Sequence, residues 1–90
     1  GFLTDMVEVY GMDGWMVDFG EWAPLDGEYD DGRDPVSAHN RYPIDWQTLN
    51  REVLEAARPD GDWTMFSRSG FLGVQGVSMI HWVGDQETNW

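Results

Sequence analysis

Two aspartates, Asp18 and Asp85, have the sequence surroundings expected of catalytic carboxylates. Asp18 follows the apolar run 15–17, and Asp85 follows the largely apolar run 79–83. Each therefore stands where a strand is expected to end and a loop to begin, which is where parallel β/α proteins place their reacting groups. A carboxylate pair suits cleavage of a glycosidic bond, because one group attacks or acts as base while the other protonates the leaving oxygen. We predict two catalytic carboxylates brought together from two strands.

The two aspartates differ in the strength of this indication. The chain has 17 acidic residues, and most acidic side chains are solvated or structural. Asp18 stands out because Val17 and Phe19 flank it, and a carboxylate among apolar side chains needs a reason to be buried. Asp85 stands out less, because Gly84-Asp85 is also an ordinary turn dipeptide.

Arg68 and Trp82 are candidate substrate-binding residues with open alternatives. Arg68 follows the strand-like run 63–67, where it can hold a carboxylate or donate to sugar hydroxyls. A structural ion pair with one of the many acids explains it equally well. The ring of Trp82 can form the apolar wall of a sugar site, or it can simply pack in the core.

The charge balance limits the partners. The formal net charge is −12, and all five basic residues are Arg. A chain with so few cations is a poor ligand for a nucleic-acid backbone or an anionic membrane surface. We therefore expect a carbohydrate substrate, with no nucleic acid and no membrane as partner; the oligomeric state stays open.

No cofactor and no metal site is expected. The chain has no Cys, so thiolate ligands, disulfides and Cys nucleophiles are excluded within it, and the redox compartment stays open with a slight preference for the cytoplasm. His39 and His81 match no ligand spacing. The spaced glycines of segment 70–76 lack the Lys of a phosphate-binding loop.

The pattern of apolar residues predicts an α/β protein with parallel strands. Helical spacing indicates a helix over 2–10, and a second helix follows Pro43, with Asp45 as its cap and an apolar stripe that includes Leu49. A long acidic loop is expected over 23–42, and long loops in compact domains are usually functional. The predicted order is helix, strand, helix, strand, short link, strand, over residues 2–10, 15–19, 45–57, 63–67, 70–76 and 77–82. The run 15–19 is apolar enough for a strand covered on both faces.

Three segments resemble glycoside hydrolase family 31, and they occur in the order of that family. The segment 14–21, an apolar strand ending in Asp18 with Glu21 close behind, resembles the nucleophile segment. Segment 66–70 resembles the Arg-Ser strand end, and segment 81–85 resembles the Trp-x-Gly-Asp acid/base motif.

The resemblance implies a retaining α-glycosidase on a (β/α)8 TIM barrel, with this chain covering approximately strands 4 to 6 and the intervening helix. Asp18 then matches the nucleophile and Asp85 the acid/base. Arg68 and Trp82 match residues that line the subsite of the non-reducing sugar, and Glu21 matches the acidic residue after the nucleophile. The expected substrates are terminal α-linked glucosides.

Two alternatives remain beside this interpretation. The phrases Asp-Phe-Gly-Glu at 18–21 and Trp-x-Gly-Asp-Gln at 82–86 are closer to the sulfoquinovosidase-like branch of the same family. A non-catalytic carbohydrate-binding module belongs to a different class and predicts a self-contained β-rich domain. We expect residues 1–90 to be a central fragment of the catalytic barrel rather than a complete domain, since six Trp, four Phe and three Tyr are many rings for so short a chain to bury.

Overall fold

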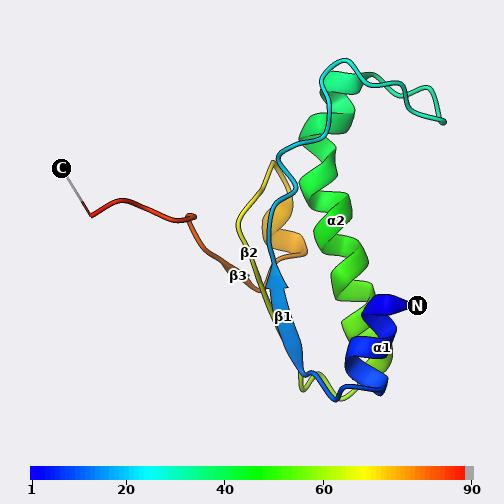
Figure 1. Cartoon of the computed structure of the whole chain (residues 1–90), viewed down its shortest axis with the longest axis vertical. Coiled ribbons are helices and arrows are strands. Elements are labelled where there is room, and N and C mark those ends of the chain that lie inside the picture. The colour runs from blue at the N-terminus through cyan, green and yellow to red at the C-terminus, as the bar shows by residue number, and fades with distance from the viewer. Residues whose placement is uncertain (89–90) are drawn as a thin grey trace.

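The computed structural model describes residues 1–88; Asn89 and Trp90, which belong to the predicted span, lie outside the described residues. Helices and strands alternate along the chain as the apolar pattern predicts (Figure 1). The elements are α1 (Phe2–Glu8), β1 (Gly14–Val17), α2 (Pro35–Ala57), β2 (Thr64–Ser67), the 3-10 helix η1 (Val74–Gly76) and β3 (Ile80–His81).

The three strands form one parallel sheet in the order β1-β2-β3. Met16 pairs with Phe66, and Phe66 pairs with Ile80, so these three residues form a row across the sheet. The parallel pairing that the sequence predicts is confirmed. β3 is shorter than the predicted strand 77–82, because Val77 still caps the 3-10 helix and only Ile80 and His81 are assigned to the strand.

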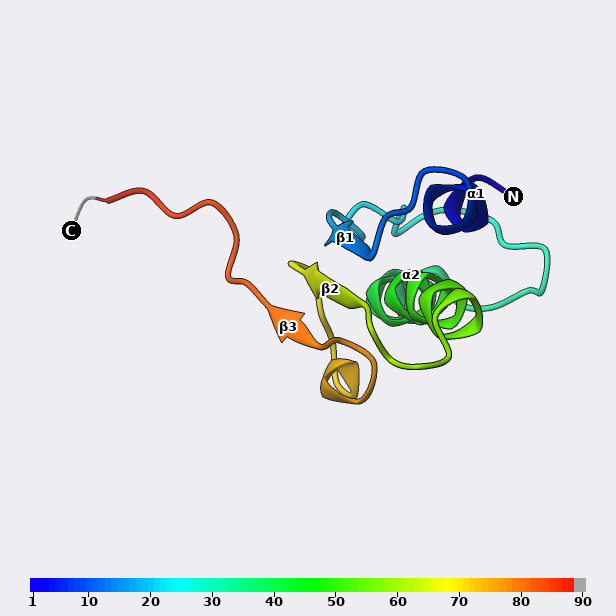
Figure 2. The ribbon, with the colours of Figure 1, turned by 90° about the horizontal axis from the view of Figure 1, so that it is seen from below.

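Helices cover one face of the sheet. α1 and α2 lie on the same side of β1 and β2 (Figure 2). Side chains of a strand alternate between its two faces. Val17 and Met65 point to the helices and are fully buried with Leu54 of α2. On the other face Met16, Phe66 and Ile80 are 49%, 37% and 55% exposed. Residues 1–88 supply helices for only one face of the run 15–19, so its cover on both faces stays a prediction.

α2 begins ten residues earlier than the sequence predicts. The side chain of Asp34 accepts a hydrogen bond from the backbone of Ser37 (2.8 Å), and Pro35 occupies the first turn, where its missing N–H costs nothing. Pro43 lies buried inside the helix instead of before it. The expected cap Asp45 is consequently a mid-helix residue that pairs with Arg41 of the preceding turn (2.8 Å). The loop predicted over 23–42 ends at Asp34.

The buried face of α2 is more polar than its apolar stripe suggests. Leu49 of the predicted stripe is half exposed, whereas Gln47 and Asn50 are completely or almost completely buried. Asn50 accepts a hydrogen bond from the indole of Trp15 (2.8 Å) and donates to the carbonyl oxygen of Trp46 (2.8 Å), so its burial is compensated. Within residues 1–88 no helix is both long and apolar enough to cross a lipid bilayer.

We expect residues 1–90 alone to be unfolded or aggregated at neutral pH and to have no activity. The uncovered row Met16, Phe66 and Ile80 forfeits about 1.5–3 kcal/mol per fully unburied large side chain, and domains are stable by only about 5–15 kcal/mol. Circular dichroism and light scattering of the isolated chain measure this. A sharp, reversible thermal transition of a monomer would contradict it.

Candidate active site at the carboxyl ends of the strands

The predicted site residues Asp18, Arg68 and Trp82 come to one row at the carboxyl ends of the three strands. Asp18 follows the last residue of β1, and Arg68 follows the last residue of β2. The backbone N–H of Trp82 donates to the carbonyl oxygen of Ser67 (2.9 Å), so the pairing of β2 with β3 continues past the assigned strands. This row lies one step beyond Met16, Phe66 and Ile80 on the uncovered face.

Arg68 lies between two carboxylates. Its Nε and Nη2 atoms donate to the two carboxylate oxygens of Glu21 (2.8 and 3.2 Å), and its Nη1 lies 3.4 Å from Oδ1 of Asp18. The bidentate hydrogen bonds to Glu21 fix the plane of the guanidinium. The side chains of Arg68 and Asp18 are only 23% and 22% exposed, so water screens this contact less than it screens a surface pair.

Two aromatic rings flank the guanidinium of Arg68. Its central carbon lies 4.8 Å from the ring centre of Phe19 and 5.6 Å from that of Trp82, distances at which cation–π attraction operates. The ring of Trp82 also meets Phe66 edge-on, with centres 6.0 Å apart. The sequence indicates Phe19 only as an apolar neighbour of Asp18; its place directly after a candidate nucleophile is the signal that could have marked it as a further candidate.

The charges around Arg68 shift two pKa values. The hydrogen bond from Arg68 holds the pKa of Glu21 below its ordinary value of 4.5, although burial acts in the opposite direction. The pKa of Arg68 is raised above its ordinary value, first by the bond to Glu21, with smaller contributions from the negative charges of Asp18 and Asp85. The negative charge of Asp85 thus acts on the same cation as that of Asp18.

Asp85 lies exposed on the segment that leaves β3 and runs away from the sheet in both views (Figures 1 and 2). Gly84 brings the start of this segment against Arg68. Its backbone has φ of 88°, and an added Cβ would lie 3.3 Å from Cδ of Arg68. A left-handed backbone and a close neighbour together favour glycine at this position, which explains why Gly precedes Asp85.

Asp18 itself is oriented by its own loop and by α2. The backbone N–H of Phe19 donates to Oδ1 of Asp18 (2.8 Å), the same oxygen that faces Arg68. The indole of Trp46 donates to the carbonyl oxygen of Asp18 (3.2 Å). Both contacts hold the strand end in place, one at the side chain and one at the backbone.

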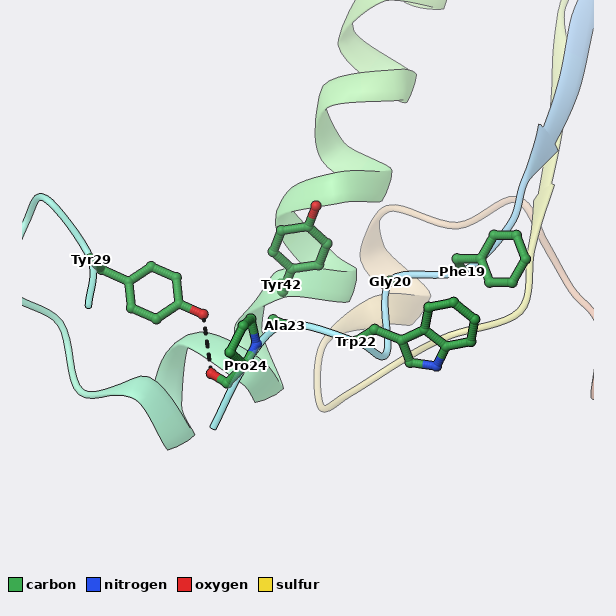
Figure 3. A pocket seen from close by; sticks show the side chains of 7 residues that line it. All are labelled: Phe19, Gly20, Trp22, Ala23, Pro24, Tyr29 and Tyr42. Carbon is green, nitrogen blue, oxygen red and sulfur yellow. Dashed lines mark hydrogen bonds between the residues drawn. The ribbon is translucent and has the colours of Figure 1, made fainter. Parts of the chain in front are cut away.

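An aromatic pocket lies beside this site rather than within it (Figure 3). Its volume is about 320 Å³, and the hydroxyl of Tyr29 closes one wall by donating to the carbonyl oxygen of Pro24 (3.4 Å). The described residues that line it include none of the predicted site residues; they are Phe19, Gly20, Trp22, Ala23, Pro24, Tyr29 and Tyr42. Phe19 lines the pocket and also lies against Arg68.

Within residues 1–88 no group of three or more His, Cys, Asp or Glu side chains has the arrangement of a metal site. His39 uses Nδ1 for a 2.6 Å contact with the carbonyl oxygen of Ala23, which ties the loop after β1 to α2. The site therefore offers carboxylates, one guanidinium and aromatic rings for chemistry.

Known proteins with similar sequences are glycosidases. The chain is 38% identical to a sulfoquinovosidase of Agrobacterium fabrum over 80 residues, 89% of this chain, and 38% identical to that of Escherichia coli over 86 residues, 96% of this chain. It is 31% identical to an α-xylosidase of Emericella nidulans over its whole length. The chain spans only 11–12% of the length of these curated relatives.

The fold agrees with these relatives. A solved family 31 sulfoquinovosidase from E. rectale, in complex with an aza-sugar inhibitor, superposes with a TM-score of 0.80 at 36% identity, covering 94% of this chain and 14% of that chain. The family model described as the glycosyl hydrolases family 31 TIM-barrel domain matches residues 2–90. The three parallel strands with their helices are thus a partial TIM-barrel region, and the chain belongs to glycosyl hydrolase family 31.

Proposed function

We propose that this chain carries both catalytic carboxylates of a retaining α-glycosidase that acts on terminal α-linked sugars. The observation that carries the proposal is the position of Asp18: it ends a parallel strand, and Oδ1 is held by Phe19 and Arg68. The contacts within residues 1–88 that orient the carboxylate fall on Oδ1, which leaves Oδ2 for attack on the sugar.

In the proposed reaction Asp18 attacks the anomeric carbon while Asp85 protonates the departing oxygen. The glycosyl ester formed on Asp18 is then cleaved by water, from which Asp85 removes the proton. Each step inverts the anomeric centre, so the product keeps the configuration of the substrate. The same two carboxylates complete the cycle without a cofactor or a metal.

Arg68, Trp82 and Glu21 are proposed to shape the sugar subsite. Arg68 lies beside Asp18, with Nη1 3.4 Å from Oδ1, and projects toward the uncovered face. Trp82 offers an apolar ring beside it. Glu21 holds the guanidinium in plane and therefore acts through Arg68 rather than on the sugar.

The same proposal assigns the strands. Residues 1–90 are a central part of the catalytic (β/α)8 barrel, with β1, β2 and β3 as approximately its fourth to sixth strands. The row Met16, Phe66 and Ile80 then faces the barrel interior, where side chains of all eight strands pack in layers. The 23-residue helix α2 and the parallel pairing disfavour a β-rich carbohydrate-binding module.

The substituent that the sugar carries distinguishes two candidates within the family. We propose a terminal α-glucoside as substrate; the sulfoquinovosidase relatives support an α-sulfoquinovoside as the second candidate. Rates of the complete enzyme on aryl α-glucoside and aryl α-sulfoquinovoside, compared at equal concentration, decide between them.

In the complete enzyme we expect Asp18→Ala to lower kcat by on the order of 10⁴-fold, since no covalent intermediate can form. Azide or formate fits the space left by the carboxylate and is expected to restore part of the turnover with inverted product configuration. NMR of the glycosyl azide that forms measures that configuration. Near-normal activity of the variant without added anion would remove Asp18 from the nucleophile role.

Asp85→Ala is the matched comparison. Loss of the acid is expected to slow substrates with poor leaving groups strongly and aryl glycosides with good leaving groups much less, because the latter depart without protonation. Equal losses on both kinds of substrate would contradict the acid/base assignment.

The variant Glu21→Gln tests whether the ion pair with Glu21 fixes the guanidinium of Arg68. Because Arg68 lowers the pKa of Glu21, the ionised pair stabilises the folded state above about pH 4.5 and loses this effect as the pH falls through the lowered pKa. The melting temperatures of wild type and variant are thus expected to differ at neutral pH and to converge in acid.

Activity supplies the second readout. We expect kcat of Glu21→Gln to fall by about 10-fold at neutral pH, since a loosened guanidinium no longer orients Asp18. Glu55→Gln removes the exposed pair with Arg51 and is the control, expected to leave kcat unchanged. A pH-independent difference in melting temperature for Glu21→Gln would show that the ion pair is not its cause.

A further inference from the structure

A set of polar groups is buried between α2 and β2 directly behind Arg68. Gln47 and Ser67 are completely buried, and Ser69 is 5% exposed. Burying amides and hydroxyls destabilises a fold unless each finds a hydrogen-bond partner. Apolar side chains would fill the same space without that requirement. The buried polar groups are therefore expected to hold a neighbouring segment in place.

The side chain of Gln47 bridges the two residues on either side of Arg68. Its Oε1 accepts a hydrogen bond from the hydroxyl of Ser67 (3.1 Å), and its Nε2 donates to the carbonyl oxygen of Ser69 (2.5 Å). Since neighbouring residues of a strand point to opposite faces, Ser67 projects to α2 and Arg68 to the site. Ser69 follows the strand and offers its backbone carbonyl to Gln47. The amide therefore anchors the end of β2 from behind.

Ser69 also connects the end of β2 to the loop after β1. Its hydroxyl donates a short hydrogen bond to the carbonyl oxygen of Phe19. Phe19 has φ of 62°, a left-handed conformation that is unfavourable for a residue with a side chain, and Gly20 follows with φ of 104°. A Cβ on Gly20 would lie 2.6 Å from Oγ of Ser69, so the glycine leaves the space that the serine hydroxyl occupies.

The strained residue adjoins the candidate nucleophile. The N–H of Phe19 is the group that donates to Oδ1 of Asp18 (2.8 Å), and the direction of this N–H depends on the conformation of Phe19. Strained backbone persists only where its surroundings enforce it. The hydroxyl of Ser69 holds the carbonyl oxygen of Phe19, and the N–H of the same Phe19 contacts the carboxylate of Asp18.

We propose that Ser69, braced by Gln47, is a positioning residue that enforces the left-handed turn at Phe19 and so aims the carboxylate of Asp18. The inference rests on the proposed role of Asp18 as nucleophile. The proposal predicts that loss of the Ser69 hydroxyl impairs attack on the sugar without weakening the binding of the sugar. A purely structural role, in which the serine only satisfies buried groups, predicts loss of stability with normal turnover by the folded enzyme.

Ser69→Ala in the complete enzyme tests this proposal. We expect kcat to fall by about 10–100-fold while KM changes by less than about threefold, because the nucleophile is misplaced within an intact sugar site. We also expect similar losses on aryl glycosides with good and poor leaving groups, since a better leaving group does not correct the aim of Asp18. A defect acting through Asp85 would instead be relieved by good leaving groups.

Ser78→Ala is the matched control. The hydroxyl of Ser78 lies 2.7 Å from that of Ser67 in the same network, and its other bond goes to the carbonyl oxygen of Ile80 (3.0 Å), away from Phe19. This variant is expected to keep the wild-type kcat. Gln47→Met, which retains the length of the side chain and removes both bonds, is expected to lower kcat in the same direction as Ser69→Ala, with unchanged KM.

Three outcomes would overturn the proposal: wild-type kcat in Ser69→Ala, an equal loss in Ser78→Ala, or a loss confined to KM. The variant Asp18→Ala shows whether the positioning role of Ser69 fails alone or together with the proposed function. If Asp18→Ala is inactive while Ser69→Ala keeps wild-type kcat, only the positioning role falls. If Asp18→Ala turns over normally, both proposals fall.

Discussion

The alternation of side chains along β2 is the constraint on which the rest of this structure depends. Met65 and Ser67 point toward α2, whereas Phe66 and Arg68 point to the uncovered face. One strand thus contributes to the apolar core, to the polar contacts with α2 and to the candidate site at once. A shift of register by one residue would exchange these faces, burying the guanidinium and exposing the core methionine. Parallel pairing with β1 and β3 then brings Asp18 and Trp82 to the same row as Arg68.

Arg68 differs from the other basic residues in its burial and its aromatic contacts. Each of the five Arg side chains contacts an acidic partner, which agrees with the excess of acids in the chain. The pairs of the other four lie at the surface, where ion pairs contribute little. Arg68 is less exposed than those four, and its guanidinium lies near two aromatic rings. This position is consistent with the sugar subsite proposed for Arg68.

The sequence predicted those features that local patterns encode and missed those that depend on tertiary contacts. Strand ends at Asp18 and Arg68 follow from apolar runs that stop at a charge, and the parallel order follows from the alternation of helix and strand. The sequence pattern places the start of α2 too late because Pro43 indicates a boundary, although Asp34-Pro35 followed by Ser37 is itself a helix-start signal. Gln47 and Ser69 were missed because a buried polar residue has no sequence signature distinct from an exposed one; only their partners reveal them.

The central claim is that Asp18 forms a covalent bond to the sugar, and trapping that bond tests it most directly. A 5-fluoro-α-glycosyl fluoride loses fluoride as the carboxylate attacks, and the ring fluorine slows hydrolysis of the resulting ester. Mass spectrometry of peptides from the treated complete enzyme then locates the added glycosyl group. We predict the label on the peptide that contains Asp18, and none on that peptide in Asp18→Ala. A label on Asp85, or on any carboxylate other than Asp18, would contradict the account.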